Sequence, residues 1–193
     1  YGLVGSEMCI RDSSMAQRRG LGTKRIESWR ASADFAVDAF NDGAHSVALA
    51  TVGDPAVYST FTYLRANVEE RLPDVVIALV PGITAMQAIA AAAGTPLVEG
   101  REILALVPAT VGSEKLGEVL DVVDSVTVYK GGRKMPEVLE QIRERGRDAI
   151  IGTDVSLPTQ HLLGLAQVEA DESAPYFSTV LSVPERPVTG GKL

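Results

Sequence analysis

An α/β architecture is the fold class that this sequence predicts, and three observations support it. Short apolar runs recur along the chain, each bounded by glycine, proline or aspartate, which is typical of buried strands. Between these runs lie segments with apolar residues three or four positions apart, as in helices that bury one face. Strands that alternate with helices favour a sheet covered by helices.

The first elements are a helix and a strand. Apolar residues form one stripe over 26–40, which predicts a helix, and Asn41-Asp42-Gly43 ends it. The run 47–51 is short and apolar, as in a buried parallel strand, and Gly53-Asp54-Pro55 breaks it.

The next three elements repeat this order. Residues 58–72 are expected to be helical, because apolar side chains recur every three or four positions. A β-branched run over 74–80 predicts a strand, which Pro81-Gly82 ends. The alanine-rich segment 84–93 predicts a helix that is capped by Gly94.

The second half of the chain continues the alternation and ends in a polar stretch. The same criteria predict strands over 103–107, 125–129 and 149–152, helices over 114–120 and 135–145, and an antiparallel strand over 176–183. Residues 184–193 have the composition of a linker.

Composition excludes several classes of protein. The chain has 193 residues, of which 46% are hydrophobic and 22% charged, so it can bury a core and is not a disordered chain. Its net charge of −7 disfavours a protein that binds nucleic acid by neutralising phosphates. One cysteine, Cys9, cannot form an internal disulfide. No apolar run reaches the length of a membrane span, about 18 residues.

Three glycine-bearing turns follow predicted strands, where open α/β sheets bind ligands. In 51–55, a glycine lets a ligand approach the backbone closely and Asp54 can accept hydrogen bonds from it; alternatively, the turn only reverses the chain. In 81–85, Thr84 can cap a helix whose free N–H groups face an anionic ligand; alternatively, it only caps the helix. In 129–133, two cations beside two glycines can bind an anion; alternatively, they form a solvated basic loop.

Other catalytic patterns are missing from the sequence. His45 and His161 lie far apart and outside any metal-ligand spacing, so no metal site is expected. The sequence contains no Gly-x-Ser-x-Gly, no Walker loop and no complete Gly-x-Gly-x-x-Gly.

Together, the turns match the order of motifs in a known family. The string GDPAVYSTFTYL over 53–64 resembles the GDPxxYSTFxYL segment of the tetrapyrrole methylases, most closely the branch that methylates precorrin-2 at C20 in cobalamin biosynthesis. Residues 80–85, followed by Gly94-x-Pro96-Leu97, resemble that family's PGITA block, and residues 103–109 resemble its L.V.PA strand. Residues 127–133 resemble its VVLMKxGR strand and turn, and residues 175–178 resemble its PYFS sequence. The resemblance spans about residues 25–184.

The resemblance implies a cytoplasmic, homodimeric methyltransferase of two α/β domains, with S-adenosylmethionine in the cleft between them. A carbon of the reduced tetrapyrrole, precorrin-2 or cobalt-precorrin-2, would attack the methyl group. Tyr58 and Arg133 match positions on the substrate side, and no general base stands out, although Asp54 and Tyr58 are candidates by position. The matched cofactor positions are Val52, Gly53, Asp54, Val57, Thr84, Ala85, Lys130 and Asp154.

Both ends of the chain depart from the family pattern. Residues 4–13, VGSEMCIRDS, resemble a translated sequencing adapter, so 1–13 are expected to be an artefact rather than a natural leader. The family's GxGPGD loop does not occur between Ser14 and Ser46, which predicts a truncated N-terminal domain over 14–97. A C-terminal domain over 98–184 follows. Residues 185–193 are expected to be a linker towards a fused C17-methyltransferase, or a tail.

Two other functions remain open at this point. The chain could be a different methylase of this family, acting on uroporphyrinogen III, diphthine or ribosomal RNA, although the PYFS ending and the Tyr58-Ser-Thr-Phe61 run speak against this. Alternatively, it could be an inactive fragment that only binds ligand, because the GxGPGD loop is missing.

Overall fold

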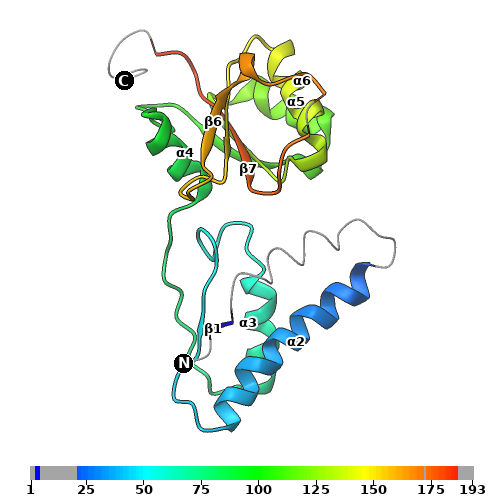
Figure 1. The fold of residues 1–193 in the computed structure, drawn as a ribbon, viewed down its shortest axis with the longest axis vertical. Helices are drawn as coiled ribbons and strands as arrows, with labels where there is room; N and C mark the ends of the chain where they lie inside the picture. The colour runs from blue at the N-terminus through cyan, green and yellow to red at the C-terminus, as the bar shows by residue number, and fades with distance from the viewer. Residues whose placement is uncertain (1–2, 5–20, 172, 187–193) are drawn as a thin grey trace. The chain divides into compact units, whose positions relative to one another are not determined.

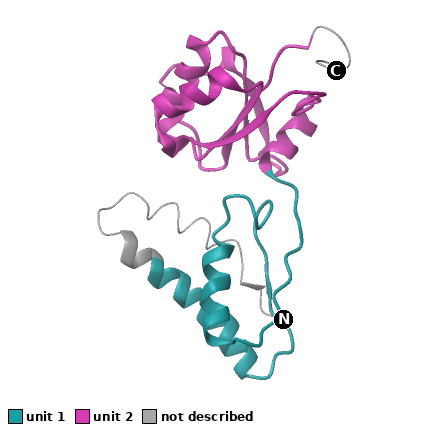
Figure 2. Cartoon of the chain, turned by 180° about the vertical axis from the view of Figure 1, so that it is seen from behind, with its two compact units in different colours: residues 1–84 teal, residues 85–193 magenta. Residues whose placement is uncertain are grey.

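A computed structural model describes residues 3–4, 21–171 and 173–186. The chain divides into two compact units, residues 1–84 and 85–193 (Figure 2). The domains expected from the sequence divide between residues 97 and 98, so the helix at 85–93 falls in the second unit rather than in the first domain.

Two packed helices form the core of unit 1 (Figure 1). They are α2 (Leu21–Asn41) and α3 (Phe61–Arg71), and their contact buries Ala33, Ala36, Leu64 and Val68. The rings of Trp29 and Tyr63 stack with centroids 4.0 Å apart, and Arg71 forms an ion pair with Asp34. Both helices were predicted, with α2 beginning five residues earlier and α3 three residues later than expected.

A two-stranded parallel pair completes the regular structure of unit 1. Strand β2 (Ala48–Leu49), shorter than the predicted run, pairs with β1 (Leu3–Val4). Residues 3 and 4 belong to the segment 1–13 that the sequence analysis expects to be an artefact. The remainder of 1–13 lies outside the described residues.

The predicted strand over 74–80 does not form. These residues have no strand partner in the part of unit 1 that the structure describes, and Val76 and Val80 are 93% and 79% exposed. The prediction is wrong because a β-branched run becomes a strand only where another strand pairs with its backbone N–H and C=O groups.

Unit 2 is built on a five-stranded mixed sheet of order β3-β4-β7-β5-β6. The strands are β3 (Leu104–Pro108), β4 (Ser125–Tyr129), β5 (Ile150–Thr153), β6 (His161–Gly164) and β7 (Ser178–Ser182). β3 and β4 are parallel, whereas β7 is antiparallel to both β4 and β5, as predicted for this strand. The carboxyl ends of β3, β4 and β5 therefore share one edge of the sheet with the amino end of β7. The sequence did not predict β6.

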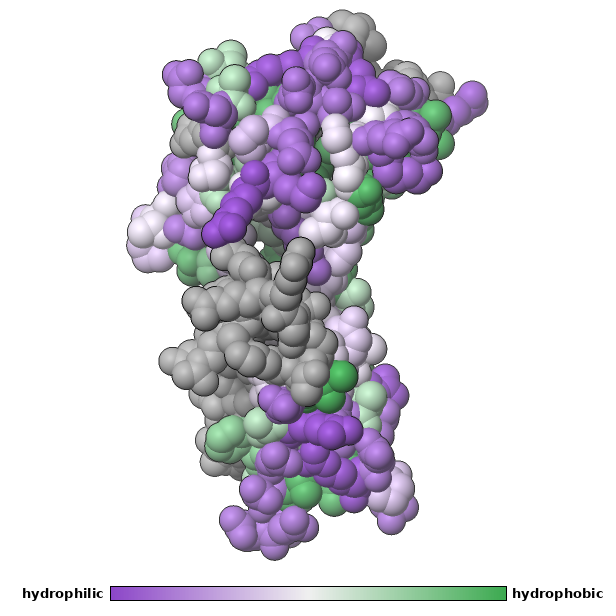
Figure 3. Space-filling view, turned by 90° about the vertical axis from the view of Figure 1, so that its right-hand side faces the viewer, coloured by the Kyte–Doolittle hydropathy of each residue, from purple (hydrophilic) through white to green (hydrophobic). Residues whose placement is uncertain are grey.

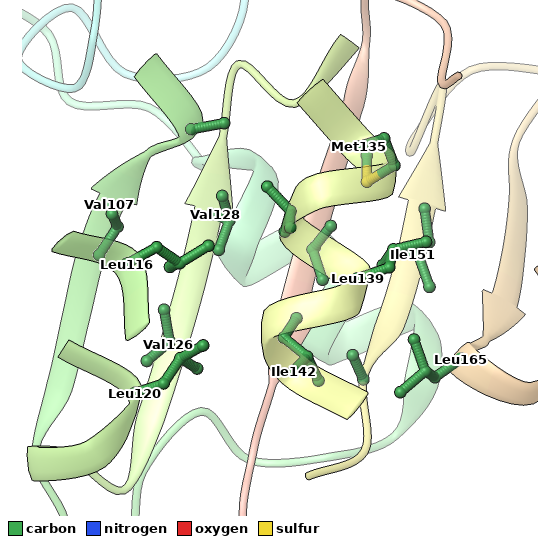
Figure 4. Close-up of a cluster of buried hydrophobic side chains, with 14 of the residues drawn as sticks. Val107, Leu116, Leu120, Val126, Val128, Met135, Leu139, Ile142, Ile151 and Leu165 are labelled. Atoms are coloured by element: carbon green, nitrogen blue, oxygen red, sulfur yellow. The ribbon is translucent and has the colours of Figure 1, made fainter. Parts of the chain in front are cut away.

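Helices α5 (Ser113–Val122) and α6 (Met135–Glu144) cover one face of this sheet (Figure 4). Their apolar side chains, including Leu116, Leu139 and Ile142, pack against Val126, Val128, Ile151 and Val180 of the strands. Three short 3-10 turns, at 109–111, 132–134 and 165–167, connect these elements. The largest buried cluster of the described chain is thus in unit 2.

Helix α4 (Ala85–Ala93) lies on the opposite face of the sheet. Its Ile89 is fully buried against Leu181, the residue after Val180, and successive strand residues point to opposite faces. Gly152 makes room for this contact, because an added Cβ would lie 2.5 Å from Ile89 Cγ1. The position of α4 on unit 2 therefore depends on a glycine in β5.

Arg186, at the end of the described chain, is bound to other residues of unit 2. Arg186 donates two hydrogen bonds to the Glu102 carboxylate and a third to the Pro96 carbonyl. Arg186, the second residue of the expected linker 185–193, is therefore bound to unit 2, and residues 187–193 lie outside the described part.

The surface shown in Figure 3 is mostly hydrophilic, with hydrophobic residues in small separate patches. Within the described residues, none of the helices combines the length and the apolar character needed to span a bilayer.

Candidate functional site

In unit 1, Asp54 joins the loop after β2 to the segment that leads into α4. Its Oδ2 accepts a hydrogen bond from the Gly82 N–H at 2.9 Å, and its Oδ1 accepts one from the Ala56 N–H at 2.8 Å. These two backbone donors, Gly82 first, lower the pKa of the Asp54 carboxyl below its usual value, because they stabilise the charged form. The carboxylate is thus held ionised between two loops 28 residues apart.

Two glycines allow these loops to touch. Gly53 has φ +79°, a conformation that favours glycine. A Cβ added at Gly82 would lie 2.2 Å from the Gly53 carbonyl oxygen, so the backbones approach too closely for any side chain. A Cβ at Gly53 would lie 4.0 Å from Thr84 Cα. The structure therefore brings together the predicted residues Gly53, Asp54 and Thr84.

The other predicted residues of unit 1 surround this junction in the sequence. Val57 donates its N–H to the Asp54 carbonyl at 3.1 Å, which closes the turn. Val52 is 62% exposed, and Tyr58 is exposed with a positive φ of 51°. Beside the turn at Asp54, the apolar side chain of Val52 and the aromatic side chain of Tyr58 are thus exposed to solvent.

In unit 2, the predicted residues lie at the edge where β4 and β5 end. Lys130 and Arg133 follow β4 and are exposed, and Gly131 between them is buried. The hydroxyl of Tyr129 accepts a hydrogen bond from the Met86 N–H at 3.2 Å, which ties the first turn of α4, beginning at Ala85, to the end of β4. Ala85 and Lys130 are therefore near the same edge.

Asp154 follows β5 at this edge and has three backbone or side-chain bonds. Its N–H donates to the Phe177 carbonyl at 3.1 Å, and its carbonyl accepts the Leu157 N–H at 2.9 Å. Its carboxylate accepts a hydrogen bond from Thr159 Oγ1 at 2.9 Å. These bonds shape the turn after β5 and place Asp154 beside the PYFS segment.

Three predicted site residues share an uncommon backbone conformation. Tyr58, Lys130 and Asp154 have φ values of 51°, 59° and 50°, and Ser156 is the fourth non-glycine residue of this kind in the described chain. Such conformations cost energy in side-chain-bearing residues and cluster at functional sites. The strain thus supports a role in binding for the turns after β4 and β5.

Two residues of these turns were not among the predicted site residues. Gly82 was expected to end a strand and to lie in the turn 81–85, but its contact with Gly53 depends on tertiary structure. Tyr129 was expected to end a strand and to open the turn 129–133, without a role of its own. Its position as the last residue before a Lys-Gly-Gly turn was the signal that could have marked it.

Each unit by itself has the chemistry of binding more than of acid–base catalysis. Unit 1 offers glycine-lined backbone and one ionised carboxylate, and unit 2 offers two exposed cations; features of both kinds suit orientation of a polar ligand. Among the described residues, no three His, Cys, Asp or Glu side chains gather as ligands for a metal ion.

An α/β sheet with glycine turns at its carboxyl edge defines a class of ligand-binding proteins, and comparison with known proteins identifies the family. A family model described as "Tetrapyrrole (Corrin/Porphyrin) Methylases" matches residues 7–168. The chain belongs to this family, as its motifs predicted. The match begins inside the segment expected to be an artefact.

Curated relatives agree with this assignment. A precorrin-2 C(20)-methyltransferase of Sinorhizobium sp is 32% identical over 161 residues, which is 82% of this chain and 64% of the relative. The cobalamin biosynthesis protein CobIJ of Mycobacterium bovis is 33% identical over 81% of this chain and 30% of its own length. A probable cobalt-precorrin-2 C(20)-methyltransferase of Methanocaldococcus jannaschii is 40% identical over 55% of this chain and 43% of its own. The chain spans less than two thirds of the length of these relatives.

Solved structures confirm the predicted α/β fold of this family. The methyltransferase CobJ superposes with a TM-score of 0.63 at 25% identity, covering 97% of this chain and 85% of that one. A uroporphyrin-III C-methyl transferase of Thermus thermophilus, complexed with S-adenosyl homocysteine, gives a TM-score of 0.60 at 16% identity over 79% and 72% of the two chains. The second likeness concerns the fold alone.

If Asp54 holds the cofactor, as we propose below, Asp54→Asn should weaken S-adenosylhomocysteine binding about tenfold, because the amide carries no charge for the two N–H donors and can present only one oxygen to them. The lowered pKa means that the carboxylate interaction is fully present above the usual carboxyl pKa and is lost as the pH falls through the lower folded value. Calorimetric titration from pH 8 down to pH 4 should therefore give a nearly constant affinity for the native chain. A decline that begins near neutral pH, or an unaffected D54N variant, would contradict this role.

Proposed function

We propose that this chain is an S-adenosylmethionine-dependent methyltransferase that acts on precorrin-2, or on its cobalt complex, at C20 in cobalamin biosynthesis. The observation that carries the proposal is the junction of Gly53, Asp54 and Gly82, where the two motif loops meet through a backbone contact and a carboxylate bridge. The substrate is inferred from the relatives of Sinorhizobium sp and M. jannaschii, which are named as methyltransferases of precorrin-2 and cobalt-precorrin-2.

The cofactor would be held by residues of both motif groups. We propose Val52, Gly53, Asp54, Val57, Thr84, Ala85, Lys130 and Asp154 for this role. The junction fits a ligand of this kind, because glycines let it approach the backbone closely and exposed Val52 offers an apolar contact. Asp54 keeps its charge, which suits a cationic or hydroxyl-bearing ligand.

When bound, S-adenosylmethionine supplies an electrophilic methyl group, which is transferred to carbon and leaves S-adenosylhomocysteine. The residues of this chain would act mainly by orientation, because methyl transfer requires the carbon, the methyl group and the sulfur in line. Asp54 is a weak candidate for a general base, since both of its oxygens accept backbone hydrogen bonds and its pKa is lowered. Its role is therefore assigned to positioning.

The substrate side would be formed by Tyr58 and Arg133. Precorrin-2 carries several carboxylates, and an exposed guanidinium can bind one of them with two hydrogen bonds. Lys130 lies three residues before Arg133 and adds a second positive charge. With a chain charge of −7, such local cations rather than the overall field would hold the anionic substrate.

Assembly and cellular location follow from the same proposal. We propose a cytoplasmic homodimer, as the family resemblance implies. The relative CobIJ, of which this chain matches 30%, supports a fused C17-methyltransferase as a partner domain in relatives of this chain.

The decisive experiment is methyl transfer with labelled S-adenosylmethionine, using precorrin-2, cobalt-precorrin-2 and uroporphyrinogen III as alternative acceptors. We expect transfer to one of the first two. Transfer to uroporphyrinogen III alone would move the chain to another branch of the family. If the chain binds S-adenosylhomocysteine but methylates none of the three, the interpretation as a ligand-binding fragment holds instead.

Arg133→Ala provides a test at the level of one side chain. We expect it to raise the KM for the tetrapyrrole about tenfold and to leave S-adenosylhomocysteine affinity within about twofold, because it removes a guanidinium proposed to bind a substrate carboxylate and Arg133 is not among the proposed cofactor residues. The matched control is Lys115→Ala, which removes another exposed cation, paired with Glu118 on α5. Equal behaviour of the two variants would remove Arg133 from the substrate site.

A further inference from the structure

Residues 174–178 cross the ends of β4 and β5 as a tethered segment. The Ala174 N–H donates to the Gly132 carbonyl at 3.1 Å, in the turn after β4. The Phe177 carbonyl accepts the Asp154 N–H at 3.1 Å, in the turn after β5. The segment then enters β7, where the Ser178 hydroxyl lies 2.8 Å from Thr153 Oγ1 in a buried pair.

This tether fixes the backbone on both sides of Tyr176. Ala174, two residues before it, is bound to one turn, and Phe177, the next residue, is bound to the other. Tyr176 nevertheless remains 53% exposed, with its ring edge-on to Phe177 at a centroid distance of 5.0 Å. An aromatic ring on a tethered backbone loses little further entropy when it contacts a ligand.

The chemistry around Tyr176 is specific. Through Gly132, the tethered segment is joined to the turn that carries the exposed Lys130 and Arg133. An exposed aromatic ring on a segment that is bonded to the turn with two cations suits a large, flat, conjugated molecule with carboxylate arms, because the ring can contact its face and the cations can bind its arms. Such a molecule is the substrate under the proposed function.

We propose that Tyr176 is a specificity-determining residue whose ring contacts the tetrapyrrole macrocycle and not the cofactor. This inference rests on the proposed function and adds a residue to it. The exposed ring contributes little to the core of unit 2, in contrast to Ser178, which is buried with Thr153. A change at Tyr176 should therefore affect substrate more than folding.

The test compares Tyr176→Ala and Tyr176→Phe in the full chain. We expect Y176A to raise the KM for precorrin-2 about tenfold and to leave the affinity for S-adenosylhomocysteine within about twofold. Y176F keeps the ring face and should stay within about threefold of the native KM. The matched control is Val122→Ala, which shortens a 75% exposed side chain on α5 just before β4 begins, at the other end of the strand.

The outcomes separate this inference from the proposed function. If the native chain methylates precorrin-2 and Y176A does so with the KM of V122A, the inference alone is overturned. If Y176A weakens S-adenosylhomocysteine and precorrin-2 equally, the ring supports the fold of the site and the inference is also overturned. A native chain that methylates only uroporphyrinogen III contradicts the proposed function, and Tyr176 as a determinant for precorrin-2 falls with it.

Discussion

Gly82→Ala is expected to abolish measurable binding of S-adenosylhomocysteine, with an affinity loss of at least a hundredfold. The new Cβ would lie 2.2 Å from the Gly53 carbonyl oxygen and 3.0 Å from its carbonyl carbon. Both atoms are backbone, so no side-chain rotation can relieve the clash and the two loops must separate. Separation also breaks the bond from the Gly82 N–H to Asp54. Overpacking of this kind typically costs about 1–3 kcal/mol even where side chains can adjust.

A matched variant separates this clash from the conformational effect of replacing a glycine. Gly43, also in unit 1, has φ +92° but nothing within 4 Å of an added Cβ. Gly43→Ala should therefore lower stability by about 1 kcal/mol through backbone strain and leave binding unchanged. Calorimetry and chemical unfolding of both variants distinguish the two effects. Binding by G82A at native affinity would show that the junction of Gly53 and Gly82 is not part of the cofactor site.

Local patterns in the sequence predicted the elements of unit 2 well. Strand β4 begins and ends at the predicted residues, and α6 ends one residue early. The reason is physical: Val126 and Val128 are buried inside a completed sheet, so the local apolar pattern and the tertiary environment agree. The same agreement placed the turn at Lys130, where a positive φ follows the strand.

The sequence-based predictions of strands were wrong where strand formation depends on pairing with residues that are distant in the sequence. Residues 74–80 have strand composition, but they have no strand partner in the described part of unit 1 and Val76 remains exposed. Strand β6 was missed because His161–Gly164 carries only two strongly apolar residues and forms by pairing with β5. Strand β6 is therefore stabilised by its hydrogen bonds to β5 more than by the strand propensity of its own residues.

The candidate site shows the same division. Motif resemblance selected Gly53, Asp54 and Thr84 individually, but not the bond that links Asp54 to Gly82 across 28 residues. It also selected the PYFS segment, but neither the bond from Phe177 to Asp154 nor the bond from Ala174, the residue before the segment, to Gly132. Contacts between residues far apart in sequence follow from the packing of the whole unit, so they require the structure.

The ion pair of Arg186 and Glu102 supplies the second large effect. Arg186 donates to both Glu102 oxygens, at 3.1 and 2.6 Å, and the side chains are only 11% and 2% exposed. We expect Arg186→Met to lower the stability of unit 2 by about 3 kcal/mol, because it leaves the Glu102 charge buried without its partner. The double variant R186M/E102M should recover most of this loss, since an apolar pair carries no buried charge. Urea unfolding measures the stability of both variants. If R186M is as stable as the native chain, the Arg186–Glu102 ion pair does not stabilise unit 2.

The acid dependence of this effect follows from the pKa of Glu102. The hydrogen bond from Arg186, the largest cause, lowers that pKa below its usual value, despite burial acting in the opposite direction. The folded pKa therefore lies below the unfolded one, so the stabilisation is complete above a pH of about 4.3 and disappears as the pH falls through the folded value. The stability difference between the native chain and R186M should accordingly be constant from pH 8 to pH 5 and shrink in more acidic buffer. A difference that stayed the same down to pH 2 would mean that Arg186 acts through its bond to the Pro96 carbonyl, which does not titrate, rather than through the carboxylate.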